Sequence, residues 1–216
     1  SRGLGDVYKR QGYVSLNKHG EQLCGDRVEI SSTEDSTIMV LADGLGSGVK
    51  ANILSTLTSK IISTMVANGL ALEDCVNTIA STLPVCKVRS VAYSTFTIIR
   101  ITSNSEAEII QYDNPHVIML RDGKHIEPPE TSVIIDGKTI YKSRVRLTEG
   151  DVLIAMSDGC IHAGVGLELN FGWQRENIIE FMETMYNPDY TAKTLATLLL
   201  DLSLIHISEP TRQAEI

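Results

Sequence analysis

The stretch from Thr37 to Gly48, TIMVLADGLGSG, decides which fold this sequence predicts. Its apolar run indicates a buried strand that leads into Asp43, and Gly44 lets the backbone turn so that its carbonyl can face the same point as the carboxylate. A second apolar run, Asp151–Ala155, leads in the same way into Met156-Ser157-Asp158-Gly159. Asp-Gly alone is an ordinary turn dipeptide. Two such strand ends side by side, however, would gather the hard oxygen ligands that magnesium and manganese prefer.

The segments next to this stretch alternate between strand and helix patterns. Tyr13–Leu16 and Arg27–Ile30 alternate as half-buried strands do. From Val49 the pattern becomes helical up to Gly69, and a second helix is predicted over Leu72–Leu83. One apolar stripe predicts the buried face of the first helix: Ile53, Leu54, Leu57, Ile61, Ile62, Met65 and Val66.

The rest of the chain continues with strands and ends with helices. Asp122-Gly123 has the composition of a tight hairpin turn. The predicted strands are Ser94–Ile101, Glu106–Asp113, His116–Arg121, His125–Ile126, Lys138–Leu147 and Val152–Met156, and the predicted helices are Ile178–Met185 and Ala192–Leu200. This order predicts an α+β fold in which helices cover sheets.

The glycine-rich segment Gly44–Lys50 also invites comparison with nucleotide-binding loops. A Walker loop ends in Gly-Lys-Ser/Thr, but here Val49 separates Gly48 from Lys50, and Ala51 stands where a hydroxyl would bind magnesium. The dinucleotide fingerprint would need a glycine at position 49. What remains is a helix N-terminus built of small residues, whose N–H groups favour a nearby anion such as phosphate. Nucleotide binding is therefore the weaker hypothesis.

The two ends of the chain can be encoded by one DNA element read on its two strands. The codons AAG-AGA-CAG for Lys9-Arg10-Gln11 read on the opposite strand as CTG-TCT-CTT, which encodes Leu202-Ser203-Leu204, and the match continues through residues 1–8 and 205–212. Such an inverted repeat resembles the adapter used in DNA-library preparation. We therefore expect residues 1–11 and 202–216 to lie outside the domain, which would span residues 12–201 and be truncated.

Composition excludes several classes of function. The chain carries a net charge of −8 and no cluster of lysine or arginine, which argues against binding nucleic acid or an anionic membrane. No apolar run approaches membrane-spanning length. The cysteines have no Cys-x-x-Cys spacing, so we expect reduced thiols in a cytoplasmic protein, with neither a disulfide nor a zinc site: Cys24, Cys75, Cys86 and Cys160.

Several short motifs follow one another along the chain: Cys24-Gly25-Asp26, Leu41–Gly48, Gly150-Asp151 and Met156–Gly159. In this order and spacing, the chain resembles the SpoIIE-type branch of the metal-dependent serine/threonine phosphatases (type 2C, or PPM, class) over nearly all of Gly12–Asp201. The resemblance implies an α/β/β/α sandwich of two stacked antiparallel sheets flanked by helices, with a two-metal site at one edge. It also implies a final strand, preceded by an Asp-Asp ligand, that this chain would lack.

The resemblance assigns metal ligands to particular residues. Asp43 would bridge two divalent cations, Mn²⁺ or Mg²⁺. The Gly44 carbonyl would bind the first cation and Asp158 the second. Asp26 would contribute either as a direct ligand or through water.

Three further side chains are candidates for contact with the substrate. Arg27 and Lys50 could bind its phosphate, and His162, close after Asp158, could protonate the leaving group. Arg27 and Lys50 could equally be solvated surface charges, and for His162 a surface or hydrogen-bonded histidine is the stronger alternative.

The leading hypothesis is an enzyme that hydrolyses phosphoserine and phosphothreonine in proteins with a water activated by two metals. Its substrates, by resemblance, would be anti-anti-sigma proteins or other partners of bacterial serine kinases, and a homodimer or an upstream regulatory domain is compatible with it. Without its last ligand, the chain itself could be inactive. The alternative is a non-catalytic regulatory or binding module that keeps the fold. An Asp-Asp pair in the uninterrupted gene would favour the enzyme, and neutral residues in its place would favour the module.

Overall fold

The computed structural model describes residues 10–17, 22–82, 85–86, 91–92, 94–162 and 173–208, without the side chains of residues 80, 85, 86, 91, 92 and 204–208. The chain divides into two compact units. Unit 1 consists of Ser1–Val14, Val117–Glu127 and Thr148–Ile216, and unit 2 consists of Ser15–His116 and Pro128–Leu147. Asp43 and the helix after it therefore belong to unit 2, and Asp158 belongs to unit 1.

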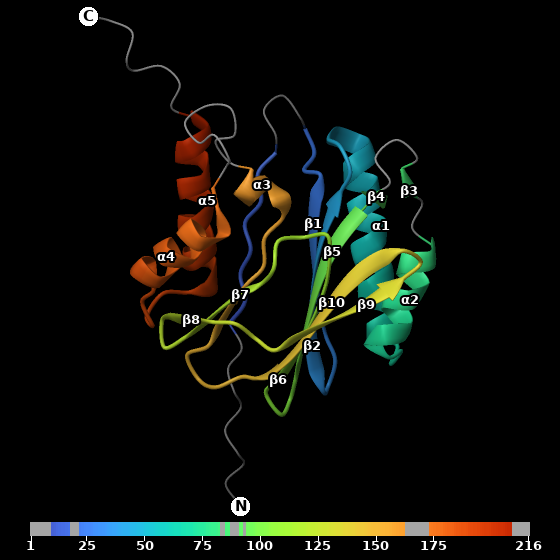
Figure 1. The fold of residues 1–216 in the computed structure, drawn as a ribbon, viewed down its shortest axis with the longest axis horizontal. Coiled ribbons are helices and arrows are strands. Elements are labelled where there is room, and N and C mark those ends of the chain that lie inside the picture. The colour runs from blue at the N-terminus through green and yellow to red at the C-terminus, as the bar shows by residue number, and fades with distance from the viewer. Residues whose placement is uncertain are drawn as a thin grey trace, which may run out of the picture. The chain divides into compact units, whose positions relative to one another are not determined.

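Unit 2 is built on a six-stranded antiparallel sheet with the strand order β1-β2-β5-β6-β10-β9 (Figure 1). Its strands are β1 (Asp26–Ser32), β2 (Ser36–Gly44), β5 (Ser94–Thr102), β6 (Glu106–Tyr112), β9 (Glu130–Ile135) and β10 (Lys138–Arg146). A short ribbon pairs β3 (Val85–Cys86) with β4 (Val91–Ala92). Helices α1 (Gly48–Ala67) and α2 (Leu72–Thr82) pack on the sheet.

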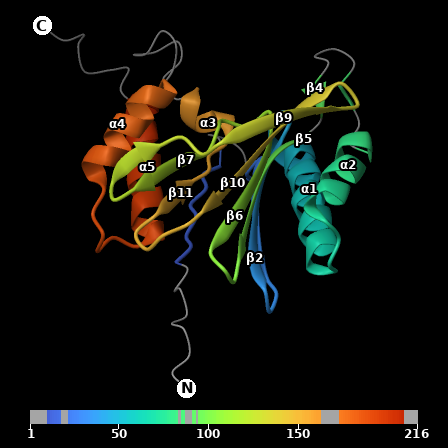
Figure 2. The same ribbon diagram turned by 60° about the horizontal axis from the view of Figure 1, so that its bottom comes forward.

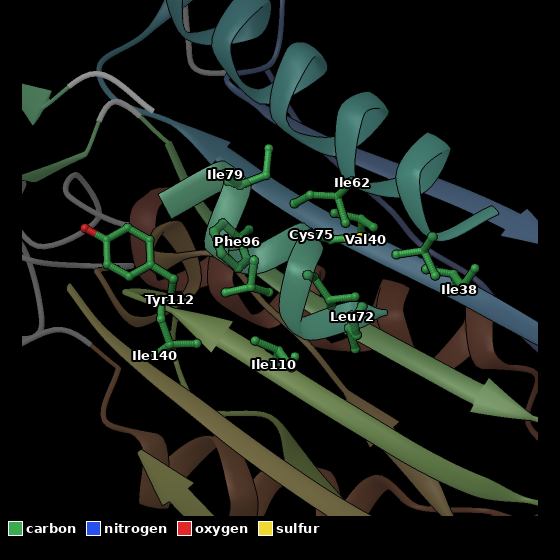
Figure 3. Packing of buried hydrophobic residues seen from close by; sticks show 13 residues of the cluster. Ile38, Val40, Ile62, Leu72, Cys75, Ile79, Phe96, Ile110, Tyr112 and Ile140 are labelled. Atoms are coloured by element: carbon green, nitrogen blue, oxygen red, sulfur yellow. The ribbon is translucent and has the colours of Figure 1, made fainter. Parts of the chain in front are cut away.

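The core of unit 2 lies between this sheet and its two helices. Alternate residues of β2, such as Ile38 and Val40, are fully buried, because successive side chains of a strand point to opposite faces. They meet Ile62 of α1 and Cys75 of α2, and Phe96 of β5 completes the centre of the cluster (Figure 3). Burial of these apolar side chains is the main force that holds the helices on the sheet.

The face that α1 turns to the sheet differs from the predicted stripe. Ile62 and Val66 are buried as expected, but Ile53, Leu57 and Ile61 are 51%, 54% and 41% exposed. The buried residues of α1 are mostly small: Gly48, Ala51, Ser55, Thr58, Ser59, Ile62, Ser63 and Val66. The predicted stripe is wrong in this part because small side chains allow the helix a close approach, which hydrophobicity alone does not reveal.

Unit 1 contains a three-stranded antiparallel sheet in the order β11-β7-β8, with three helices (Figure 2). The strands are β7 (Ile118–Arg121), β8 (Lys124–Ile126) and β11 (Val152–Ile154), and the helices are α3 (Asp158–Ile161), α4 (Arg175–Met185) and α5 (Ala192–Ser208). One apolar cluster joins them, with Leu120 from the sheet, Ile178 from α4 and Leu199 from α5 among its members.

The fold class predicted from the sequence is confirmed: two antiparallel sheets, each with helices packed on it. The hairpin turn at Asp122-Gly123 is confirmed too, because both residues have positive φ between the paired strands β7 and β8. The predicted strand at Tyr13–Leu16 is wrong, since this segment has no regular structure, and β9 was not predicted.

The chain's ends bear on the predicted domain limits only in part. Helix α5 runs past Asp201 to Ser208, whereas residues 1–9 and 209–216 lie outside the described residues. The limits of 12 and 201 stay a prediction. None of the described helices is both long enough and apolar enough to cross a bilayer.

Candidate metal centre

The strongest feature of the site is the register of β1 against β2. Asp26 lies directly opposite Asp43 in this antiparallel pair. Side chains at directly opposite positions project from the same face, with Cβ atoms about 4.5–5.5 Å apart, and two like charges so placed repel each other. Both residues are half-buried. A divalent cation bound by both carboxylates would remove this repulsion, so the pair has the chemistry of a ligand pair for a hard cation.

Gly44 continues this site on the backbone. It is buried, and its N–H donates to the carbonyl of Gly25 at 3.2 Å. A Cβ atom at position 44 would lie 2.0 Å from the carbonyl oxygen of Ala51 in α1. The close approach of α1 therefore requires glycine here and fixes the backbone next to Asp43.

The two aspartates affect the pKa of the Cys24 thiol. Burial raises the pKa of the Cys24 thiol, and the negative charges of Asp26 and Asp43 raise it further. Its Sγ donates to the carbonyl of Leu16 at 3.3 Å. Cys24, Cys75 and Cys160 carry free thiols, while the side chain of Cys86 lies outside the described residues.

Asp158 lies at the start of a short helix in unit 1. It is the exposed first residue of α3, after a short connection from β11. Strand β11 belongs to the three-stranded sheet and β2 to the six-stranded sheet, so the two acidic turns do not follow neighbouring strands of one sheet. His162 follows the last residue of α3, and its N–H donates to the carbonyl of Asp158 at 2.9 Å.

The donors found together suit a hard cation. Asp26 and Asp43 offer carboxylates, and the backbone at Gly44 offers a carbonyl, all of them oxygen ligands of the kind that Mg²⁺ and Mn²⁺ bind. Among the described residues, no group of three or more His, Cys, Asp or Glu side chains is gathered closely enough to hold a metal. The register of β1 and β2 thus brings two of the predicted ligands together, and the assignment of all four stays a prediction.

Arg27 and Lys50 are the candidate residues for binding the substrate phosphate. Arg27 follows Asp26 in β1, so its side chain projects from the opposite face, and its guanidinium lies 4.0 Å from Glu29. Lys50 is an exposed residue in the first turn of α1. The structure therefore does not group Arg27 with the two carboxylates, and the roles of Arg27, Lys50 and His162 stay predictions.

Sequence reasoning missed a partly buried polar network beside Asp43. Thr95, the residue opposite Asp43 in the pairing of β2 with β5, donates its hydroxyl proton to Oδ1 of Asn114 at 2.6 Å. Nδ2 of Asn114 in turn donates to the hydroxyl of Thr97 at 3.1 Å. Only the high content of hydroxyl residues in β5 could have hinted at this network.

An ion pair in unit 1 explains the Gly150-Asp151 motif. The Asp151 carboxylate is buried and accepts hydrogen bonds from Nε and Nη2 of Arg121 at 2.9 and 2.6 Å and from the N–H of Thr148 at 2.7 Å. Burial alone would raise the pKa of Asp151, but these hydrogen bonds outweigh it and leave the pKa below its ordinary value. This carboxylate is therefore a structural anion that joins β7 to the start of β11.

Comparison with known proteins agrees with this architecture. The phosphatase domain of the cell fate determinant SpoIIE from Bacillus subtilis, solved with a fragment of its regulatory domain, superposes with a TM-score of 0.77 at 21% identity, over 94% of this chain and 60% of that one. The RsbU and RsbW domains of a Mycobacterium tuberculosis protein give 0.68 at 14% identity, over 87% and 54%. RsbX in complex with magnesium gives 0.60 at 16% identity, over 90% and 86%.

Sequence comparison identifies the family, whereas these structural comparisons show only the fold. No curated protein matched the chain. The model of the family described as Stage II sporulation protein E (SpoIIE), in contrast, matches residues 33–208, a range that includes Asp43, Asn114 and Asp158. The resemblance inferred from the short acidic motifs is thereby confirmed, and the chain belongs to the SpoIIE family, with the fold of a type 2C phosphatase domain.

Proposed function

We propose that this chain is the catalytic domain of a protein phosphatase that hydrolyses phosphoserine and phosphothreonine with Mn²⁺ or Mg²⁺. The observation that carries the proposal is the register of β1 and β2, which sets Asp26 against Asp43 beside the obligatory glycine at 44. The SpoIIE family match and the fold of RsbX, which was solved with magnesium, support it.

In this proposal the chain's residues divide the work of binding. Asp43 would bind both cations, the Gly44 carbonyl would bind the first and Asp158 the second, and Asp26 would contribute directly or through water. When bound, such cations would lower the pKa of a water and neutralise charge on the phosphoryl group. The N-terminal end of α1, just after Ser47, favours an anion, which supports a position for the substrate phosphate next to Asp43.

The partners that we propose follow from the family. The substrate is a phosphorylated protein in bacterial signalling, of the anti-anti-sigma type or another target of a serine kinase, and a regulatory domain or a second copy controls the enzyme. The similar SpoIIE structure contains a fragment of such a regulatory domain, and this chain spans 60% of its length. The free thiols of Cys24, Cys75 and Cys160 support a cytoplasmic location.

Hydrolysis of a phosphoserine peptide tests the proposal. We expect release of phosphate that requires Mn²⁺, stops with a chelator and is lost in Asp43→Asn. Asp35→Asn is the matched control, because this exposed aspartate lies in the turn at the other end of β1 and β2. The assay should be repeated on the longest product of the gene. If that product binds Mn²⁺ but releases no phosphate, the result supports the non-catalytic module over the phosphatase.

A further inference from the structure

Two members of the polar network formed by Thr95, Asn114 and Thr97 are buried, and Thr95 is half-buried. Asn114 is 7% exposed and Thr97 is 1% exposed. Burying amide and hydroxyl groups costs free energy unless they are hydrogen-bonded, and here both polar atoms of the Asn114 side chain have partners. The network is therefore satisfied, but its position next to the metal ligands calls for a reason.

That position follows from the sheet register. Asp26, Asp43 and Thr95 lie opposite one another on three adjacent strands, β1, β2 and β5, so their side chains project from the same face. Asn114 comes just after the end of β6, the next strand of the sheet, and follows Asp113, whose φ of 54° turns the chain there. The row thus runs from the two carboxylates to the threonine and then to the asparagine.

The direction of the hydrogen bonds gives the network a chemical consequence. A hydroxyl has one proton, and the proton of Thr95 goes to Oδ1 of Asn114. The Asn114 amide is held in this orientation because its Nδ2 donates to Thr97 on the other side. Without Asn114, the hydroxyl of Thr95 would be placed to donate a hydrogen bond to the carboxylate of Asp43. That hydrogen bond would occupy a lone pair that a cation could otherwise use.

We propose that Asn114 is a positioning residue of the metal centre, which draws the Thr95 hydroxyl proton away from Asp43 so that the carboxylate presents its lone pairs to a divalent cation. This inference rests on the proposed metal-dependent function. It assigns to Asn114 no contact with metal or substrate, only control over the direction of one O–H bond.

Mn²⁺ affinity, measured by calorimetry on the whole chain, tests the proposal without using activity. Asn114→Ala removes the acceptor of the Thr95 hydroxyl, which can then donate a hydrogen bond to Asp43 instead. We expect the Kd for Mn²⁺ to rise by roughly tenfold, the effect of one hydrogen bond to a charged group. Thr95→Val removes the proton altogether and should leave the Kd near its original value. The double variant Asn114→Ala/Thr95→Val should therefore bind Mn²⁺ almost as tightly as the unchanged chain.

This recovery in the double variant distinguishes positioning from mere structural support. If the network only stabilised the fold, the second substitution would weaken Mn²⁺ binding further, and that outcome, or an unchanged Kd in Asn114→Ala, would overturn the proposal. Thr97→Val is a milder second variant, expected to raise the Kd several-fold because it leaves the amide free to turn. Thr58→Val on α1 is the control, since it removes a hydroxyl that is 1% exposed and has no partner among the described residues.

The same measurement separates this proposal from the proposed function. If the unchanged chain binds Mn²⁺ and Asp43→Asn does not, the metal site stands, and the Asn114 variants decide the positioning role alone. Absence of Mn²⁺ binding by the unchanged chain would overturn the metal site and the positioning role with it.

Discussion

At the scale of single residues, the end of β2 is constrained on both sides. Asp43 projects beside Asp26 and Thr95, while the backbone at Gly44 passes so close to α1 that a side chain has no room. A carboxylate on a freely moving loop would lose entropy on binding a cation. Here the sheet and the helix fix it in advance, which favours tight binding.

Gly44→Ala tests this constraint. Its Cβ would lie 2.0 Å from the Ala51 carbonyl oxygen, so either the first turn of α1 or the end of β2 must move. We expect a loss of about 2–4 kcal/mol in the free energy of unfolding, as for other strongly overpacked sites. Urea denaturation measures it. The control is Gly159→Ala, where the nearest atom is the Ser157 hydroxyl at 3.8 Å and the helix should tolerate alanine. Equal losses in the two variants would contradict the close approach.

Asp151 supplies a second prediction at this scale, on the dependence of stability on pH. Its pKa is lowered in the folded chain, so its stabilising effect is present above the unfolded value, about 3.9, and is lost as pH falls through the folded value. Asp151→Asn leaves Arg121 with a neutral partner and should cost about 2–3 kcal/mol at pH 7. The difference between variant and unchanged chain should shrink below about pH 4.

Unfolding curves at pH 7 and pH 3 check this dependence. Asp122→Asn is the control because Asp122 is exposed and its positive φ suits asparagine equally well. A difference between the Asp151→Asn variant and the unchanged chain that stayed constant with pH would show that the Asp151 charge does not act through its ion pair.

At the scale of elements, α1 shows where hydrophobic periodicity succeeds and where it fails. The sequence predicts the helix and its approximate ends, because the apolar residues recur with helical spacing. It misplaces the buried face, because Ser55, Ser59 and Ser63 have small side chains that fit against a sheet as well as apolar ones do. Their hydroxyls cost little to bury, since each donates to a carbonyl of its own helix.

Two substitutions in α1 measure this difference. Ile62 is fully buried in the core of unit 2, so Ile62→Ala should cost about 2–5 kcal/mol of stability. Leu57 is 54% exposed, and Leu57→Ala should change the free energy of unfolding by less than about 1 kcal/mol. Thermal or urea unfolding of both variants gives the answer. A large loss of unfolding free energy in Leu57→Ala would instead support the buried face that the sequence predicted.

At the scale of the whole molecule, the sequence predicts the kinds of element and the fold class better than it predicts the site. Local patterns reveal each strand that precedes an acidic turn. The pairing of Asp26 with Asp43 and the bond between Thr95 and Asn114 depend on which strands become neighbours, and composition carries no trace of that register. The family resemblance supplied ligand roles that spacing alone could not assign, and those roles remain predictions.

The limits of the domain give the last prediction. The inverted coding of the two ends predicts that residues 202–216 lie outside the domain, yet Leu202 packs against the apolar cluster of unit 1. Removing residues 202–216 should therefore lower stability by about 1–2 kcal/mol, the effect of partly burying one leucine. Removing residues 1–11 should have less effect, since Gly12 is where the chain comes close to α5 at Lys193. Unfolding of chains spanning 1–216, 12–216 and 12–201 compares the two ends. Equal stability of all three would favour the limits inferred from the coding pattern over the packing of Leu202.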